Sequence, residues 1–263
     1  MNCGGDGRDG SPSPAEPIVS RVSRQALRLP AYRRDPEGTH PPLDSPAYRS
    51  TALRHPKRPL VLLPQRLTEV TGPLLGPGRI GPQDNDLTRQ HEDEPVGQRI
   101  LVHGRLLDGD GGPVRNSLVE IWQANAAGRY RHIGDRWPAP LDPNFDGVGR
   151  TLTDDEGRYE FLTVKPGAYP WGNHDNAWRP AHIHFSVFGS AFTQRLVTQM
   201  YFPDDPLFDQ DPIFNSVPDP KARERMISRF DLSRTVESWA LAFEFDIVLR
   251  GREASVFEDE EDE

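Results

Sequence analysis

The sequence predicts a mainly β fold, a β-sandwich of two mostly antiparallel sheets, on the basis of three observations. Several short runs rich in β-branched and aromatic residues follow residue 99, clusters of Gly, Pro and Asp separate them, and apolar residues alternate with polar ones within them. The expected strands are residues 100–102 and 106–107, 118–122, 151–153, 159–162, 181–187, 195–201 and 241–249. In the last run Phe243, Phe245, Ile247 and Leu249 form one apolar face.

Two turn-forming segments connect expected strands. Residues 108–113 (Asp-Gly-Asp-Gly-Gly-Pro) follow the first strand, and residues 154–157 (Asp-Asp-Glu-Gly) separate 151–153 from 159–162. Short Asp/Gly turns between apolar runs favour hairpins, so we expect the strands on either side of each turn to pair.

One short helix is expected near residues 219–230. Asp219 is an N-cap candidate and Pro220 suits the first helical position. Met226, Ile227 and Phe230 would then lie on one side of the helix.

The 263 residues are expected to form four parts. Residues 1–17 consist mostly of turn formers and are predicted to be disordered. Residues 18–98 are rich in proline and arginine and are predicted to wrap a neighbouring domain or subunit, with a disordered leader as the alternative. Residues 99–257 hold the sandwich and any catalytic site. Residues 258–263 form an acidic tail that supplies six negative charges to a net charge of −9.

Composition excludes several functional classes. A single cysteine, Cys3, excludes a disulfide framework and a thiolate-rich zinc or iron–sulfur site. The chain has neither the basic footprint of a nucleic-acid-binding protein nor an apolar stretch long enough to span a membrane. Because residues 1–20 lack the apolar core of a secretory signal, we expect a cytoplasmic protein.

A histidine pair is the main candidate for a metal site. His182 and His184 are two residues apart in an alternating stretch, so both imidazoles project to one face while Ile183 and Phe185 occupy the other. Two neutral nitrogens on a rigid strand can hold one metal ion. The alternative is that the histidines are ordinary polar residues of a half-exposed strand, and their spacing leaves both readings open.

Two tyrosines are candidate oxygen ligands. A single tyrosine is usually a core or interface residue, but Pro166 and Pro170 restrict the backbone on both sides of Tyr169. If Tyr130 and Tyr169 join the histidines, two phenolates and one hydroxide balance the three positive charges of a ferric ion. Such a neutral centre can be buried without a large desolvation cost. The combination therefore favours ferric iron and oxidative chemistry.

Five segments, taken together, resemble those of the intradiol ring-cleaving dioxygenases. They are residues 119–132, 141–145, 165–171, 178–185 and 245–251, within a resemblance that extends from about residue 46 to 257. The resemblance implies a β-sandwich enzyme with non-haem Fe(III) that inserts both atoms of O₂ into an aromatic ring. It is strongest to members that cleave protocatechuate together with an α-type subunit, so it implies protocatechuate, O₂ and an α chain as partners.

The resemblance also implies roles for single residues. The implied iron ligands are Tyr130, Tyr169, His182 and His184. The implied catalytic residues are Tyr169, which would leave the iron and accept a proton, Arg179 and Gln199. The implied substrate-pocket residues are Tyr48, which would contact the substrate carboxylate, Trp122, Trp171 and Ile213. Trp137 departs from the family pattern, which has a tyrosine there.

Two alternatives stay open at this point. A catechol or hydroxyquinol 1,2-dioxygenase would share the site, although those relatives carry a helical N-terminal dimerisation region that residues 1–98 do not resemble. A transthyretin-like β-sandwich would share the strand pattern but would only bind, and it would purify without iron.

Overall fold

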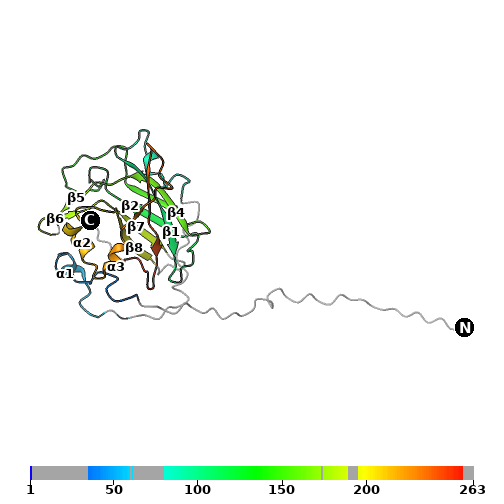
Figure 1. The fold of residues 1–263 in the computed structure, drawn as a ribbon, viewed down its shortest axis with the longest axis horizontal. Coiled ribbons are helices and arrows are strands. Elements are labelled where there is room, and N and C mark those ends of the chain that lie inside the picture. The colour runs from blue at the N-terminus through cyan, green and yellow to red at the C-terminus, as the bar shows by residue number, and fades with distance from the viewer. Residues whose placement is uncertain (2–34, 60, 62–79, 173, 189–194, 257–263) are drawn as a thin grey trace. The chain divides into compact units, whose positions relative to one another are not determined.

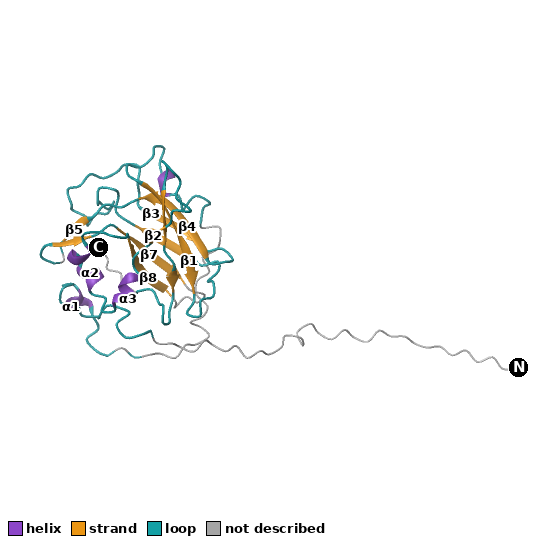
Figure 2. Cartoon of the chain, viewed as in Figure 1, coloured by secondary structure: helices purple, strands orange, loops and turns teal. Residues whose placement is uncertain are grey.

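Two β-sheets facing each other make up the part of the chain that holds the candidate site (Figures 1 and 2). The computed structural model describes Met1 and residues 35–59, 61, 80–172, 174–188 and 195–256. The chain divides into a unit of residues 1–32 and a unit of residues 33–263, and all that follows concerns the second.

The strands fall into two sheets and one small ribbon. The first sheet contains β1 (Arg99–Leu107), β4 (Arg158–Val164), β9 (Arg229–Phe230), β10 (Leu241–Glu244) and β11 (Ile247–Val248). The second has the order β3 (Val148–Leu152), β2 (Leu118–Trp122), β7 (His182–Phe188) and β8 (Arg195–Tyr201). The ribbon pairs β5 (Tyr169–Trp171) with β6 (Ala177–Arg179).

Antiparallel pairing predominates over the two sheets taken together. In the first, β1 pairs antiparallel with β4 along one edge, whereas β10 and β11 follow each other along its other edge in parallel orientation. Every pairing in the second sheet is antiparallel. The predicted β-sandwich of mostly antiparallel sheets is confirmed.

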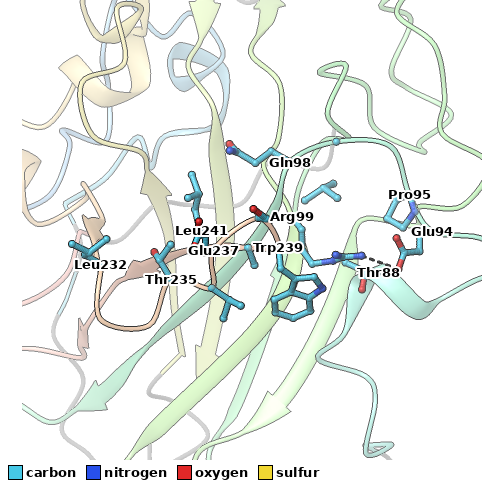
Figure 3. Close-up of a pocket in the computed structure, with 15 residues that line it drawn as sticks. Thr88, Glu94, Pro95, Gln98, Arg99, Leu232, Thr235, Glu237, Trp239 and Leu241 are labelled. Atoms are coloured by element: carbon cyan, nitrogen blue, oxygen red, sulfur yellow. Dashed lines mark ion pairs between the residues drawn. The ribbon is translucent and has the colours of Figure 1, made fainter.

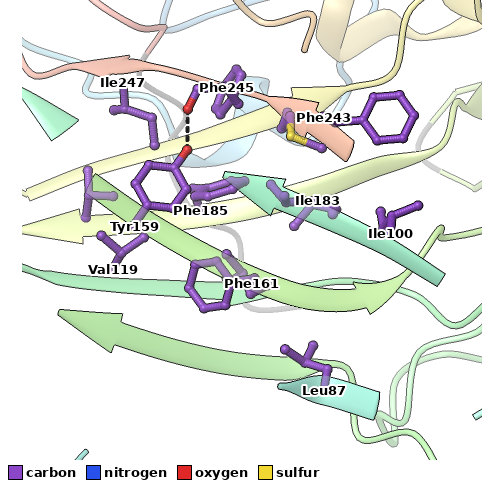
Figure 4. Packing of buried hydrophobic residues seen from close by; sticks show 14 of the residues in the cluster. Leu87, Ile100, Val119, Tyr159, Phe161, Ile183, Phe185, Phe243, Phe245 and Ile247 are labelled. Carbon is purple, nitrogen blue, oxygen red and sulfur yellow. Dashed lines mark hydrogen bonds between the residues drawn. The ribbon is translucent and has the colours of Figure 1, made fainter. Parts of the chain in front are cut away.

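The main hydrophobic core fills the space between the sheets. Ile183 and Phe185 of β7 point into it from the second sheet and Phe161 of β4 from the first, all fully buried (Figure 4). Burying each of these side chains contributes roughly 1.5–3 kcal/mol. The hydroxyl of Tyr159 donates a hydrogen bond to the carbonyl of Phe245, which satisfies two polar groups that would otherwise be costly to bury. The inward face of β7 is thus fixed by packing, and its histidines point the other way.

The two predicted hairpins are wrong. β1 and β2, which flank residues 108–113, belong to different sheets, and so do β3 and β4, which flank residues 154–157. Each turn carries the chain from one sheet to the other, because β4 pairs along its own full length with β1 and β2 lies between β3 and β7. Local turn chemistry indicated the reversals correctly, but it did not indicate the partners.

The helices are short. They are α1 (Thr51–Arg54), η4 (Leu87–Arg89), η5 (Phe208–Gln210), α2 (Pro212–Asn215) and α3 (Pro220–Glu224). The predicted start of α3 is confirmed, since the Asp219 side chain accepts a hydrogen bond from the backbone N–H of Lys221. The predicted extent to residue 230 is wrong: Tyr201 of β8 exchanges backbone hydrogen bonds with Met226 and Ser228, which draws the chain into an extended path.

The expected strand 241–249 is also interrupted. β10 ends at Glu244 and β11 begins at Ile247, because the ladder with β1 is broken between them: the backbone N–H of Arg105 donates to the side chain of Asp246, and the carbonyl of Phe245 accepts from the Tyr159 hydroxyl. Both pieces remain on the same edge of β1.

The described part of the Pro-rich segment packs on the sandwich. Leu87 of η4 is fully buried in the main core, and a carboxylate oxygen of Asp35 accepts a hydrogen bond from the backbone N–H of Gly251 at 2.7 Å. Contact of this segment with another subunit stays a prediction. The predicted disordered stretch 1–17, apart from Met1, and the acidic tail 258–263 lie outside the described residues. Within the described ranges, no helix has the length and apolarity needed to cross a membrane.

Candidate metal centre

His182 and His184 lie side by side on the outer face of β7. Their Nε2 atoms are 3.2 Å apart, and Ile183 points into the core between them. Nδ1 of His182 lies 2.6 Å from the carbonyl oxygen of Pro180 and must donate to it, which leaves the lone pair on Nε2. Since every described residue of the strand up to Val187 is buried, the half-exposed alternative for the pair is wrong.

Both histidines are held in the neutral form. Burial lowers the pKa of His182 well below its usual value, and the positive charge of Arg179 and the neighbouring His184 lower it further. Burial and Arg179 likewise lower the pKa of His184. A neutral imidazole is the form that binds a metal ion, so neither group needs to lose a proton first.

Tyr169 joins the pair from the β5–β6 ribbon. It lies opposite Arg179 in the register of that ribbon, and its side chain is buried. Its hydroxyl oxygen is 3.3 Å from Nε2 of His182, with the ring centroids 5.5 Å apart. The Tyr169 hydroxyl and Nε2 of His184 therefore both lie next to Nε2 of His182.

Tyr130 lies beside this group on a loop that local hydrogen bonds fix. Oδ1 of Asn125 accepts from the backbone N–H of Arg129 at 3.0 Å, and Oδ2 of Asp135 accepts from that of Tyr130 at 2.8 Å. The second oxygen of Asp135 accepts from the backbone N–H of Trp137, the residue that departs from the family pattern.

The ring of Tyr130 contacts two other members of the group. Its centroid is 5.6 Å from that of Tyr169, edge to face, and 6.5 Å from that of His184. The structure thus brings together all four side chains that the sequence proposed as ligands.

The four side chains fit a ferric ion. Two nitrogens 3.2 Å apart match two ligands of one ion, each about 2.0–2.1 Å from it. The described residues contain no group of three or more His, Cys, Asp or Glu side chains able to hold a metal, so a site that needs carboxylates or thiolates is not formed there. Phenolate oxygens are hard anionic donors, which suit a trivalent ion, and imidazole nitrogens also bind iron.

A glycine contact sets the distance between the two tyrosines. Gly128 has φ +75°, and a side chain there would collide with the carbonyl oxygen of Ala168, the residue before Tyr169. Gly167 lies equally close, since a Cβ on it would be 2.6 Å from the backbone nitrogen of Gly128. The segments that carry Tyr130 and Tyr169 therefore come close to each other at glycine residues, which have no side chain to collide.

We expect Gly128→Ala to lower iron content several-fold while the protein stays folded, because the added methyl group would push Ala168 and Tyr169 away from Tyr130. Gly111→Ala is the matched control: Gly111 has φ +83° but open space around it, so it carries the same backbone cost of about 1–2 kcal/mol without the collision. Iron per chain and thermal unfolding check both variants. Equal iron content in the two would contradict this role for Gly128.

Arg179 and Gln199 form a buried polar cluster next to the histidines. Nη2 of Arg179 donates to Oε1 of Gln199 and, at 3.1 Å, to the hydroxyl of Tyr201. Nε of Arg179 donates to Oδ2 of Asp211 at 3.1 Å, and both side chains of this ion pair are almost completely buried.

Asp211 and Tyr201 did not appear among the residues proposed from the sequence. Asp211 precedes Pro212, a pattern that indicates a helix N-cap. It does have that role, since its Oδ1 accepts from the backbone N–H of Ile213 at 2.9 Å. Tyr201 follows Gln199 by two residues in β8 and so lies on the same face, which is the one signal that could have suggested it.

Two of the proposed pocket residues contact the group directly. The Trp122 ring stacks on His184 with centroids 4.8 Å apart and an angle of 8° between the planes. The guanidinium of Arg179 lies 5.9 Å from the Trp171 ring, which in turn contacts Tyr48 edge to face at 4.9 Å. Ile213 is connected through Asp211, whose carboxylate accepts a hydrogen bond from the Ile213 backbone N–H.

A separate pocket lies at the start of β1 (Figure 3). Arg99 makes an ion pair of 2.8 Å with Glu94 there, and its guanidinium lies 5.0 Å from the ring of Trp239. None of the residues that line it belongs to the metal centre.

Comparison with known proteins identifies the family. A model described as "Dioxygenase" matches residues 70–251, and one described as "Protocatechuate 3,4-dioxygenase beta subunit N terminal" matches residues 32–66. The chain belongs to the intradiol dioxygenase family. The resemblance seen in the motifs is confirmed, and the alternative of a protein that only binds is not supported.

Individual intradiol dioxygenases differ in their similarity to the chain. The protocatechuate 3,4-dioxygenase beta chain of Burkholderia cepacia is 60% identical over 222 residues, which cover 84% of this chain and 94% of that one. The alpha chain of the Pseudomonas putida enzyme is 32% identical over 76% of this chain and 99% of its own length. The crystal structure of 3-chlorocatechol 1,2-dioxygenase from Rhodococcus opacus 1CP is 22% identical, with a TM-score of 0.49 over 67% of this chain and 69% of that one.

Proposed function

We propose that the chain is the iron-bearing β-type subunit of a protocatechuate 3,4-dioxygenase. The enzyme would cleave protocatechuate between its two hydroxyl groups with O₂ and release 3-carboxy-cis,cis-muconate. One observation carries the proposal: the Tyr169 hydroxyl and Nε2 of His184 lie 3.3 Å and 3.2 Å from Nε2 of His182. They do so in a chain 60% identical to a protocatechuate dioxygenase beta chain.

Tyr130, Tyr169, His182 and His184 would hold the ferric ion. When bound, the ion makes the two substrate hydroxyls more acidic and withdraws electrons from the ring, which lets O₂ attack a ring carbon. Both atoms of O₂ enter the product and the ring supplies the electrons, so the reaction needs no external reductant.

Tyr169 would act as the proton acceptor. A phenol has a pKa of about 10, so a phenolate that leaves a cation is a base strong enough to take a proton from a catechol hydroxyl. The proton would go to its hydroxyl oxygen, now 3.3 Å from Nε2 of His182. Tyr169 begins β5, a three-residue strand that pairs with β6. Tyr130 and the histidines of β7 would then be the fixed part of the site.

Arg179 would stabilise negative charge that develops on the substrate. Its guanidinium is buried and its orientation is fixed by Gln199 and Asp211, so little reorganisation is needed when that charge appears. Its charge also helps to keep the two histidines neutral.

The aromatic residues around the centre would form the substrate pocket. Trp122 and Trp171 offer flat apolar walls, and Tyr48 would contact the substrate carboxylate. The guanidinium of Arg54, 4.6 Å from the Tyr48 ring, adds positive charge on that side. Ile213 would be a further wall residue.

An α-type chain is the proposed partner. The chain is similar to both the beta and the alpha chains of protocatechuate dioxygenases, and a beta-specific N-terminal model matches residues 32–66. We expect the two chains to assemble into a hetero-oligomer in which the Pro-rich segment contacts the α chain.

Oxygen uptake tests the proposal. We expect rapid uptake with protocatechuate and at least about tenfold less with catechol, because catechol lacks the carboxylate that Tyr48 would contact and leaves that side of the pocket without its polar partner. Each substrate is measured with and without a co-expressed α chain. Preference for catechol would contradict the proposed substrate. Full activity of the isolated chain would contradict the proposed need for an α chain.

A further inference from the structure

The cluster around Arg179 joins four side chains from three parts of the chain. Arg179 ends β6, Gln199 and Tyr201 lie on β8, and Asp211 precedes α2. All four are at most 2% exposed. A buried guanidinium without a compensating anion is strongly unfavourable, so the presence of Asp211 is what allows Arg179 to be charged there.

The hydrogen bonds fix the plane of the guanidinium from two sides. Oδ2 of Asp211 accepts from Nε at 3.1 Å, while Gln199 and the Tyr201 hydroxyl accept from Nη2. A planar group held at Nε and at Nη2 can neither rotate nor shift along the strand.

Asp211 is itself rigidly held. Its Oδ1 accepts from the backbone N–H of Ile213 at 2.9 Å, its backbone carbonyl accepts from the side chain of Asn215 at 2.9 Å, and its Oδ2 lies 2.9 Å from the Tyr201 hydroxyl. That hydroxyl has Oε1 of Gln199 at 2.8 Å as a second acceptor for its single proton. The carboxylate thus ties the first turn of α2 to the guanidinium and to β8.

We propose that Asp211, assisted by Tyr201, is the positioning residue of Arg179: it neutralises the buried guanidinium and holds it in the orientation needed beside the metal centre. The inference rests on the proposed function, because Arg179 has its role in catalysis only there. The ion pair sums to zero charge, so its disruption would add a net positive charge near the iron as well as release the guanidinium.

Asp211→Asn is the test variant, because an amide keeps the shape and the oxygen that caps α2 while it removes the negative charge. We expect iron content and the visible absorption to remain, anaerobic affinity for protocatechuate to stay within about threefold or to rise, and kcat to fall about 10- to 100-fold. A merely structural loss would lower affinity and kcat together. A crystal structure of the variant should show the guanidinium displaced.

Asp219→Asn is the matched control. Asp219 also precedes a proline and caps a short helix, with the backbone N–H of Lys221 at 3.0 Å, but it has no contact with the metal centre. We expect its iron content, affinity and kcat to equal those of the wild type. Tyr201→Phe should give a smaller fall in kcat than Asp211→Asn, since it removes a neutral partner and leaves the ion pair.

The inference depends on whether the effect of Asp211→Asn on kcat requires Arg179. In a chain that already carries Arg179→Lys, adding Asp211→Asn should change kcat by less than about twofold, because the two substitutions disrupt the same element. An equal fall in both backgrounds, or a wild-type kcat in Asp211→Asn, would overturn the inference. A wild-type protein that binds no iron or does not cleave protocatechuate would instead overturn the proposed function, and the orientation of Arg179 in the Asp211→Asn crystal structure would still test the role of Asp211.

Discussion

His182→Ala is expected to lose nearly all its iron and to reduce turnover by at least about 10³-fold, well beyond the 10- to 100-fold cost of losing a group that only supports a ligand. The substitution removes the nitrogen that lies between the Tyr169 hydroxyl and His184. It also leaves the carbonyl of Pro180 without its imidazole donor. Iron per chain, measured together with the phenolate-to-iron absorption in the visible range, checks the result.

His91→Ala is the control for that experiment. The His91 ring lies 3.0 Å from a carboxylate oxygen of Asp146 in a partly exposed contact outside the four-residue group, and contacts of this kind contribute about 0–1 kcal/mol. The His91→Ala variant should keep its iron and its visible absorption. If His182→Ala retained a full iron complement, His182 would not be a ligand.

Arg179→Ala is expected to keep its iron yet lose about 10²- to 10³-fold in kcat, the usual cost of removing one preorganised group that stabilises charge in the transition state. It also leaves the Asp211 carboxylate buried without its partner, which destabilises the fold by roughly 3–5 kcal/mol. Steady-state kinetics at a temperature where circular dichroism shows the variant folded separates the two effects.

The double variant Arg179→Ala with Asp211→Asn isolates the catalytic part, since it removes both charges and should recover most of the stability without recovering kcat. Arg105→Ala, which breaks an exposed ion pair with Asp246, is the surface control and should behave as the wild type. Wild-type turnover in folded Arg179→Ala would remove the role assigned to the guanidinium.

Local periodicity predicted much of the fold. The expected strands 118–122 and 195–201 have the same bounds as β2 and β8, because short runs of β-branched, aromatic and other apolar residues favour strands, and β8 is buried on both faces. The same period placed His182 and His184 on one face. Pairing partners were not predictable in this way, since the choice of β4 as the neighbour of β1 depends on contacts between residues far apart in sequence.

The boundaries that failed depend on tertiary contacts as well. α3 ends early because the backbone N–H of Tyr201 in β8 donates to the carbonyl of Met226. Nothing in the sequence around Met226 indicates that partner. Asp211 looks like an ordinary cap, because its second oxygen binds an arginine 32 residues earlier in the chain. The distance between Tyr130 and Tyr169 is set by Gly128, whose packing against Ala168 is visible only in three dimensions.

Product analysis with ¹⁸O₂ tests the central claim most directly. The chain, co-expressed with the proposed α chain, is supplied with protocatechuate under labelled oxygen, and the product is examined by mass spectrometry. A site formed by Tyr130, Tyr169, His182 and His184 around ferric iron predicts 3-carboxy-cis,cis-muconate, cleaved between the two hydroxyl-bearing carbons, with two labelled oxygen atoms. A product cleaved beside the hydroxyl groups, or one that carries a single labelled atom from the first turnover, would contradict it.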